Sequence, residues 1–206
     1  MNPKIIQIQD KLRSINNRWL PRFSYPFGAE KHHYKMQPTI PLSALTAFEQ
    51  THGIVLPEDY REFLLNIGNG GAGPFYGLLP LEKWDDALWG EIDEPKVENP
   101  KVRLLASESP LSPEVEYNDD WEEHLGNLEH GAYQGAITIC EEGCTYYSLL
   151  IVTGKARGRV VNIDGDMKPP KFAPFPDFLS WYDGWLDLTL ENAVQVGMAI
   201  QRSKRI

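Results

Sequence analysis

The sequence has little cysteine and no long apolar run. Only two of its 206 residues are cysteine, and both lie in the motif CEEGC at 140–144. Two cysteines are too few for a disulfide framework and favour a reducing compartment. No apolar stretch approaches the roughly 20 residues that span a bilayer, and the first 20 residues lack the basic-then-apolar layout of a secretory signal. We therefore expect a cytoplasmic protein that does not bind membranes.

Basic residues are also scarce, and the deficit is confined to one part of the chain. Lysine and arginine total 20 against 29 aspartates and glutamates, which gives a net charge of −9. Residues 82–130 alone hold 15 acidic and 4 basic residues. Such a segment repels phosphates, so we expect no nucleic-acid partner; it suits a basic protein instead. A solvated linker kept soluble by its carboxylates is the alternative interpretation.

The motifs of common enzyme classes are absent. There is no G-x-S-x-G nucleophile turn and no H-E-x-x-H metal helix. The glycine cluster at 68–73 lacks the lysine of a phosphate-binding loop, and it follows a predicted helix instead of preceding one. These glycines suit left-handed backbone angles in a helix cap and turn. We expect no enzyme activity, no catalytic residues and no cofactor.

Two groups of residues leave other chemistry open. Cys140 and Cys144 are spaced as zinc ligands often are, although no second paired motif accompanies them. Cys140 with His130 as its base could form a thiol nucleophile, whereas a cysteine within AITIC is more often a buried apolar residue. Asp164 and Asp166 follow a predicted strand, where carboxylates sometimes hold metals. We expect a hairpin turn, a polar turn and no metal.

Apolar periodicity predicts helices early and late in the chain, with strands between them. The first helix is marked by Ile5, Ile8, Leu12, Ile15 and Trp19, and Pro21 ends it. Further helices are predicted from an N-cap at Ser43 to His52, from Pro57 at the first helical position to Ile67, over 84–89, and over 175–198, where Pro176 and Asp177 mark the start. The inner face of the last helix is predicted to hold Phe178, Leu179, Tyr182 and Leu186.

Strands are predicted at 75–81, and in the three β-rich segments AITIC, TYYSLLIVTG and GRVVNID. The last three are joined by glycine-containing turns, which predicts an antiparallel meander. Helices followed by strands indicate an α+β domain in place of an alternating, doubly wound one.

Three segments, in order, resemble the SUKH superfamily, the group of the yeast Smi/Knr-type regulators of cell-wall synthesis and of many bacterial immunity proteins. The segment LPEDYREFLLNIGNGG is similar to the family's Leu-Pro start, aromatic-led helix and Asn-Gly-Gly. The matching positions are Leu56, Pro57, Tyr60, Phe63, Leu64, Asn69, Gly70 and Gly71. The stretch from Ile137 to Asp166 and the closing FPDFLSWYDGWL look like the family's strands and final helix. Asn162 departs from the pattern, because many relatives place tryptophan there.

The resemblance covers roughly residues 40–82 and 134–187. It implies one SUKH-like domain over 1–206, with its core signature at 40–190, an acidic insertion at about 91–130, and a twisted, mainly antiparallel sheet flanked by helices. It also implies a non-catalytic immunity protein that neutralises a cognate toxin, possibly a nuclease; an intracellular scaffold or regulatory binding module of the cell-wall-regulator type is the alternative.

A nuclease toxin must be basic to hold phosphates, so an acidic surface would suit it as a partner. The residues predicted to contact the partner are aromatic side chains beside acids and an acidic cluster: Trp84, Asp85, Asp86, Trp89, Glu91, Asp119, Asp120, Glu122 and Glu123. Buried tryptophans and a solvated linker are the alternative for these residues. Whether the chain is a monomer or a dimer stays open.

Overall fold

The computed structural model describes residues 2–17, 26–85, 105–121, 131–164 and 168–203. Within these ranges the chain forms helices and one sheet. The α-helices are α1 (Pro3–Asn16), α2 (Leu42–His52), α3 (Glu58–Asn66) and α5 (Phe178–Ser203), and two short 3-10 helices are η2 (Ala29–Lys31) and η3 (Leu81–Lys83). None of the helices in these ranges combines the length and hydropathy that crossing a bilayer requires.

The sheet is an antiparallel meander, as predicted, and it has one more short strand. Its strands are β1 (Ala136–Gly143), β2 (Tyr146–Ile151), β3 (Val160–Asp164) and β4 (Lys171–Phe172), in the order β1-β2-β3-β4. Every neighbouring pair is antiparallel. Helices and an antiparallel sheet in one domain confirm the predicted α+β class.

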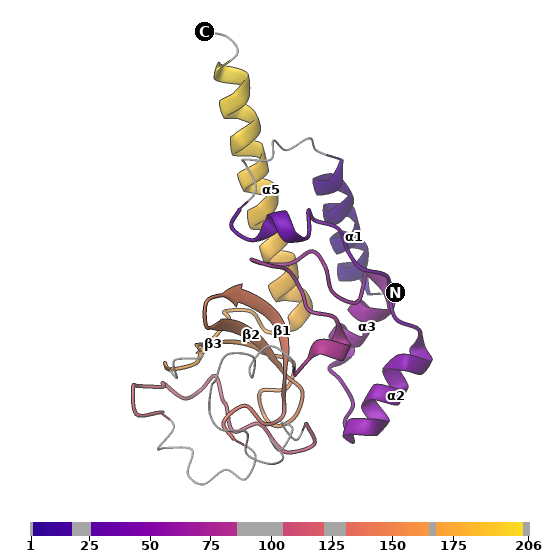
Figure 1. Cartoon of the computed structure of the whole chain (residues 1–206), viewed down its shortest axis with the longest axis vertical. Coiled ribbons are helices and arrows are strands. Elements are labelled where there is room, and N and C mark those ends of the chain that lie inside the picture. The colour runs from indigo at the N-terminus through magenta and orange to yellow at the C-terminus, as the bar shows by residue number, and fades with distance from the viewer. Residues whose placement is uncertain (1, 18–25, 86–104, 122–130, 165–167, 204–206) are drawn as a thin grey trace.

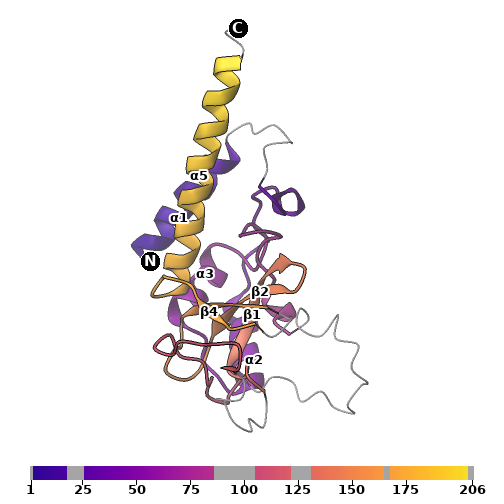
Figure 2. The ribbon, with the colours of Figure 1, turned by 90° about the vertical axis from the view of Figure 1, so that its left-hand side faces the viewer.

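The helices lie together on one side of the sheet (Figures 1 and 2). α1 runs alongside α5, and the C-terminal part of α5 extends past the end of α1. Lys11 on α1 links the two helices, because its ammonium lies 2.7 Å from Asp183 and 2.6 Å from Asp187 on α5. Ile5, Ile8, Leu12 and Ile15 are buried, which confirms four of the five predicted stripe positions; Trp19 lies outside the described residues.

Aromatic side chains from α3 and α5 fill the core beneath the helices. Phe63 packs edge-on against Phe178 and Tyr182, with ring centroids 5.1 and 4.8 Å apart. The Tyr182 hydroxyl donates to the carbonyl of Ala72 at 2.9 Å, so it satisfies a polar group that burial would otherwise penalise. All four residues predicted for the inner face of the last helix are buried, which confirms its orientation.

In the described part of the chain, residues 111–121 cover the opposite face of the sheet. Leu111 and Trp121 are each 1% exposed, and they join a second apolar cluster with alternate residues of β2 and β3. The strand residues of that cluster include Leu149, Ile151, Val161 and Ile163, whereas Leu150 and Val160 face the helices. Successive strand residues point to opposite faces, so the sheet is buried on both sides.

The glycine cluster is a turn that joins the end of α3 to the sheet. Single-residue bridges run from Met36 to Gly71, from Gly71 to Leu78 and from Leu78 to Cys140 in β1. Gly71 has φ +103°, and a Cβ there would lie 2.5 Å from the carbonyl oxygen of Lys35. Only glycine permits both this backbone angle and this close approach. The predicted structural role of the cluster is confirmed.

Several local predictions were wrong. Ser43 is not the N-cap of α2, because the helix begins at Leu42 behind Pro41. Pro57 caps α3 from outside and is not its first residue. Residues 75–81 form no strand, since only Leu78 bridges its neighbours. The predicted helix at 84–89 falls largely outside the described residues, and the helical turn before it covers 81–83.

Replacing Gly71 with alanine should destabilise the fold more than the same change at Gly158. Both glycines have positive φ, but a Cβ at Gly158 meets nothing within 4 Å. We expect Gly158→Ala to cost about 1–2 kcal/mol for its backbone angle, and Gly71→Ala to cost about 1–3 kcal/mol more for the clash. Urea unfolding of both variants measures the difference; equal losses would contradict the close approach.

Removing the Trp121 ring should destabilise the second apolar cluster. We expect Trp121→Ala to lower the free energy of unfolding by about 3–5 kcal/mol, and to make residues 105–121 more sensitive to limited proteolysis. Val115→Ala is the control, because Val115 is 51% exposed and should change stability by no more than about 0.5 kcal/mol. A Trp121→Ala protein as stable and as protease-resistant as Val115→Ala would show that the ring does not anchor the segment.

Candidate functional site

Residues 108–120, which we call the acidic loop, carry the densest exposed negative charge of the described chain segments. Within 105–121 there are five carboxylates and no lysine or arginine. All five are exposed: Glu108, Glu114, Glu116, Asp119 and Asp120. Val115, the apolar residue between two of them, is also exposed, at 51%. A basic partner would therefore meet several exposed carboxylates with an apolar side chain among them.

The loop is fastened to the sheet at two points. Leu111 and Trp121 bury their side chains in the second apolar cluster, and they bracket most of the exposed acids. Tyr117 and Tyr133 pack around Trp121, with ring centroids 5.9 and 6.0 Å from it. Because these anchors bury large rings, they fix where the charged residues between them emerge from the surface.

Hydrogen bonds within the loop and to its neighbours set its shape. The Tyr117 hydroxyl accepts from the backbone N–H of Ser112 at 2.7 Å, and Asn118 Oδ1 accepts from the N–H of Asp120 at 3.2 Å. The Thr153 hydroxyl, just after β2, donates to the carbonyl of Ser107 at 2.6 Å. Local bonds from serine, asparagine and threonine side chains are the usual stabilisers of such turns. The loop can therefore present its carboxylates in one arrangement, which lowers the entropy cost of binding.

The predicted contact residues divide into three groups. Asp119 and Asp120 lie exposed in the acidic loop. Trp84 is only 7% exposed, and its ring packs edge-on against His52 and Phe48 at centroid distances of 5.1 and 6.4 Å. Asp85 belongs with Trp84, because it is half-buried. The other five predicted residues lie outside the described residues: Asp86, Trp89, Glu91, Glu122 and Glu123.

Trp84 is therefore corrected from a partner contact to a core residue. Asp85, beside it, is half-buried. Burial lowers the pKa of His52, and the negative charge of Asp85 offsets part of that change. Trp84, His52 and Phe48 pack together at this corner of the molecule.

Sequence reasoning missed Glu108, Glu114 and Glu116 as exposed acids, and Leu111 and Trp121 as their anchors. A signal existed, because a leucine and a tryptophan are unusual within an otherwise polar, proline-rich segment. That signal has no period, however, and two isolated apolar residues do not identify the surface that covers them. Only the packed sheet shows that they bury against β2 and β3.

The cysteine pair does not form a reactive site in this arrangement. Cys140 is buried and Cys144 is exposed. The Cys140 thiol donates to the carbonyl of Pro74 at 3.2 Å, and burial raises its pKa, which disfavours the nucleophilic thiolate. The proposed base His130 lies outside the described residues.

Carboxylates beside the sheet are engaged in structural contacts. Asp164 accepts from the Thr145 hydroxyl at 2.6 Å and pairs with Lys168 at 3.1 Å. Asn162 is exposed, and its side-chain oxygen accepts from the Ser148 hydroxyl at 3.1 Å. In the part of the chain that the structure describes, no three His, Cys, Asp or Glu side chains come together as metal ligands would.

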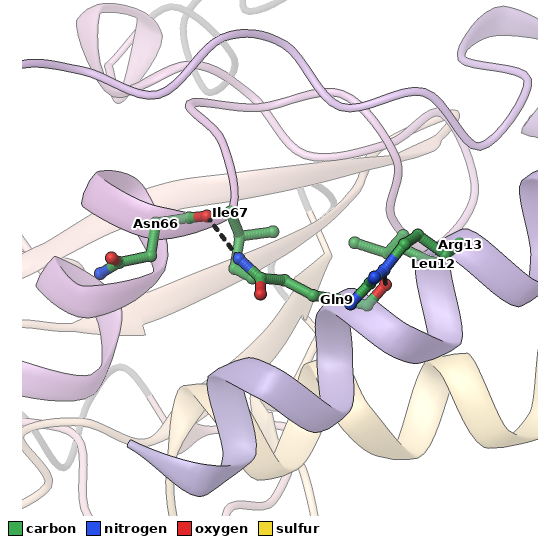
Figure 3. A pocket seen from close by; sticks show the side chains of 5 residues that line it. All are labelled: Gln9, Leu12, Arg13, Asn66 and Ile67. Atoms are coloured by element: carbon green, nitrogen blue, oxygen red, sulfur yellow. Dashed lines mark hydrogen bonds between the residues drawn. The ribbon is translucent and has the colours of Figure 1, made fainter. Parts of the chain in front are cut away.

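A shallow depression of about 400 Å³ lies between α1 and the end of α3 (Figure 3). Gln9 spans it and donates to the carbonyl of Asn66 at 3.1 Å, while Leu12 and Ile67 supply apolar surface. None of the described residues that line it is a carboxylate, a histidine or a thiol. Gln9 here satisfies a carbonyl at a helix end, so the depression lies where α1 is joined to the end of α3.

Comparison with known proteins agrees with this fold. The family model described as SMI1 / KNR4 family (SUKH-1) matches residues 39–181, more than half of the chain. The match includes α2, α3, the whole sheet and the acidic loop, and it leaves out α1 and most of α5. No curated protein and no solved structure gives a significant match. The chain belongs to the SMI1/KNR4 family (SUKH-1).

Proposed function

We propose that this chain is a non-catalytic immunity protein that binds a basic cognate toxin through its acidic loop and thereby neutralises it. The observation that carries the proposal is the row of exposed carboxylates on a loop anchored by Leu111 and Trp121. Membership of the SUKH-1 family supports it, because immunity proteins are known among SUKH relatives.

Electrostatics explains why such a loop would suit this task. An inhibitor must reach its toxin before the toxin reaches its target, and complementary charge raises association rates by about 10–10³-fold. A toxin that acts on nucleic acid needs a basic surface to bind phosphates. The carboxylates of the acidic loop would be attracted to that same surface. Because the loop is already shaped by internal hydrogen bonds, binding would require little reordering.

The absence of an assembled reaction centre in the described residues is consistent with a binding role. The one buried thiol is held in a bond to a backbone carbonyl, and the carboxylates of the acidic loop are exposed. Binding a basic protein requires a defined backbone shape and negative charge, and the acidic loop has both.

The alternative function is a regulatory or scaffold module of the cell-wall-regulator type. It is favoured by the family model, whose description names SMI1 and KNR4. Both functions use a protein partner, but they differ in the partner. An immunity protein should protect cells from the product of a neighbouring toxin gene, whereas a regulatory module should bind a housekeeping protein and give no protection.

Co-expression separates the two functions. We expect the intact chain to restore growth of cells that express the product of the adjacent upstream gene. A catalytically inactive version of that product should be harmless alone and should still bind the chain. If the active product stops growth with or without the chain, the immunity function is wrong.

Charge reversal in the loop should slow association with the toxin. We expect Glu116→Lys with Asp119→Lys to lower the association rate by at least about tenfold at low salt, because the steering field is reversed at the contact. The control is Glu58→Lys with Glu191→Lys, which changes net charge equally at exposed positions on α3 and α5. Stopped-flow fluorescence measures the rates. Equal slowing by both pairs would mean that net charge, and not the acidic loop, governs binding.

A further inference from the structure

The described surface has a second feature of opposite charge, a groove of about 430 Å³ that we call the lysine groove. Three lysines line it: Lys31, Lys35 and Lys83. Tyr76, Leu79, Pro80 and Met36 give it apolar surface. Such a concentration of lysine is unexpected on a chain with net charge −9.

The groove is built on the bridged segments beside β1. Ala72 N–H donates to the Lys35 carbonyl at 2.9 Å, and Gln37 N–H donates to the Gly70 carbonyl at 3.0 Å. Gly71 in turn exchanges two backbone bonds with Leu78, at 2.9 and 2.8 Å. Many of the lining residues therefore belong to hydrogen-bonded backbone segments. This pairing fixes the backbone position from which the Lys35 side chain extends.

The lysines of the groove form no ion pair within the described chain. None of the three ammonium groups has a carboxylate within 4.0 Å in the ranges that the structure describes. The nearby carboxylate of Glu82 is instead bound by Asn69 Nδ2, at 2.9 and 3.2 Å. Lys31 lies over the Tyr76 ring, 3.7 Å from its centroid, which positions its ammonium without cancelling its charge.

Exposed aromatic side chains adjoin the groove. Phe27 is 65% exposed and lies 5.4 Å from Tyr76, and Phe75 is 41% exposed. Gly28 packs so closely on the backbone of Phe75 and Tyr76 that a Cβ there would lie 2.4 Å from the Phe75 carbonyl carbon. Exposed aromatic rings beside cations are the residue types enriched at the centres of protein interfaces.

We infer that the lysine groove is a second protein-binding surface, which takes an extended, acidic segment carrying apolar side chains from a partner protein. The three ammonium groups would pair with its carboxylates, and Tyr76, Leu79 and Pro80 would contact its apolar side chains. A long nucleic acid suits the groove less well, because the acidic loop and the net charge would repel its backbone.

This surface is separate from the acidic loop. Segment 26–37 lies above the sheet in both views, beside α5, whereas residues 105–121 lie below it (Figures 1 and 2). The two surfaces share no residue. One chain could therefore hold a basic partner and an acidic segment at the same time, and the inference stands even if the acidic loop binds no toxin.

A labelled peptide tests the groove directly. The probe is a fluorescein-labelled peptide of alternating glutamate and leucine, and a peptide of alternating glutamine and leucine is its control. We expect the full chain to bind the acidic peptide at least about tenfold more tightly than its control, with binding that weakens as salt is added. Amide resonances of Gly71, Tyr76 and Gly77 should shift on titration.

Matched variants locate the binding. Lys35→Glu with Lys83→Glu should weaken acidic-peptide binding by at least about tenfold, since like charges replace opposite ones. Lys155→Glu with Lys171→Glu changes net charge equally at exposed lysines outside the groove and should change it by less than about twofold. Circular dichroism would verify that both variants are folded.

Three outcomes would overturn the inference. Equal weakening by both lysine pairs would mean that binding is unspecific. Tighter binding of a single-stranded oligonucleotide than of the acidic peptide would assign the groove to another ligand. Self-association in sedimentation that Lys35→Glu with Lys83→Glu abolishes would assign it to a second copy of the chain.

Discussion

The structure depends on the burial of both faces of a small antiparallel sheet. One face packs against aromatic residues of α3 and α5, and the other packs against Leu111 and Trp121 from a segment rich in acids. A sheet of four short strands with one apolar face in water would be poorly stabilised and prone to association. The acidic segment therefore stabilises the fold with two large side chains and exposes its charges. The same segment therefore stabilises the sheet and carries the exposed negative charges.

The other organising feature is the close backbone packing around Gly71. It allows segments 35–37 and 70–78 to extend the sheet by single bridges beyond β1. The same segments carry the lining of the lysine groove, and the Tyr182 hydroxyl ties the adjacent Ala72 to α5. A glycine turn that looks like a phosphate-binding loop in composition is thus a joint between helices and sheet. The joint carries the positively charged lysine groove, and the acidic loop carries the negatively charged surface.

Much of the fold was predictable because local periodicity reflects burial. The spacing of Ile5, Ile8, Leu12 and Ile15, and that of Phe178, Leu179, Tyr182 and Leu186, correctly predicted the inner faces of two helices. The candidate site was less predictable, since its anchors bury through long-range contacts. Trp121 lies in a segment without a period, and Trp84 was placed at the surface although it packs on Phe48 and His52. The strand predicted at 75–81 failed for a related reason: its apolar residues follow a glycine turn and pair only through Leu78.

The central claim is that the acidic loop is where a basic toxin binds. Hydrogen exchange, measured with the chain alone and in complex with the catalytically inactive product of the adjacent upstream gene, tests this most directly. The account predicts that backbone amides between Ser109 and Trp121 become protected in the complex, while those of α2 exchange as before. Protection confined to other segments, with the loop amides unchanged, would contradict it.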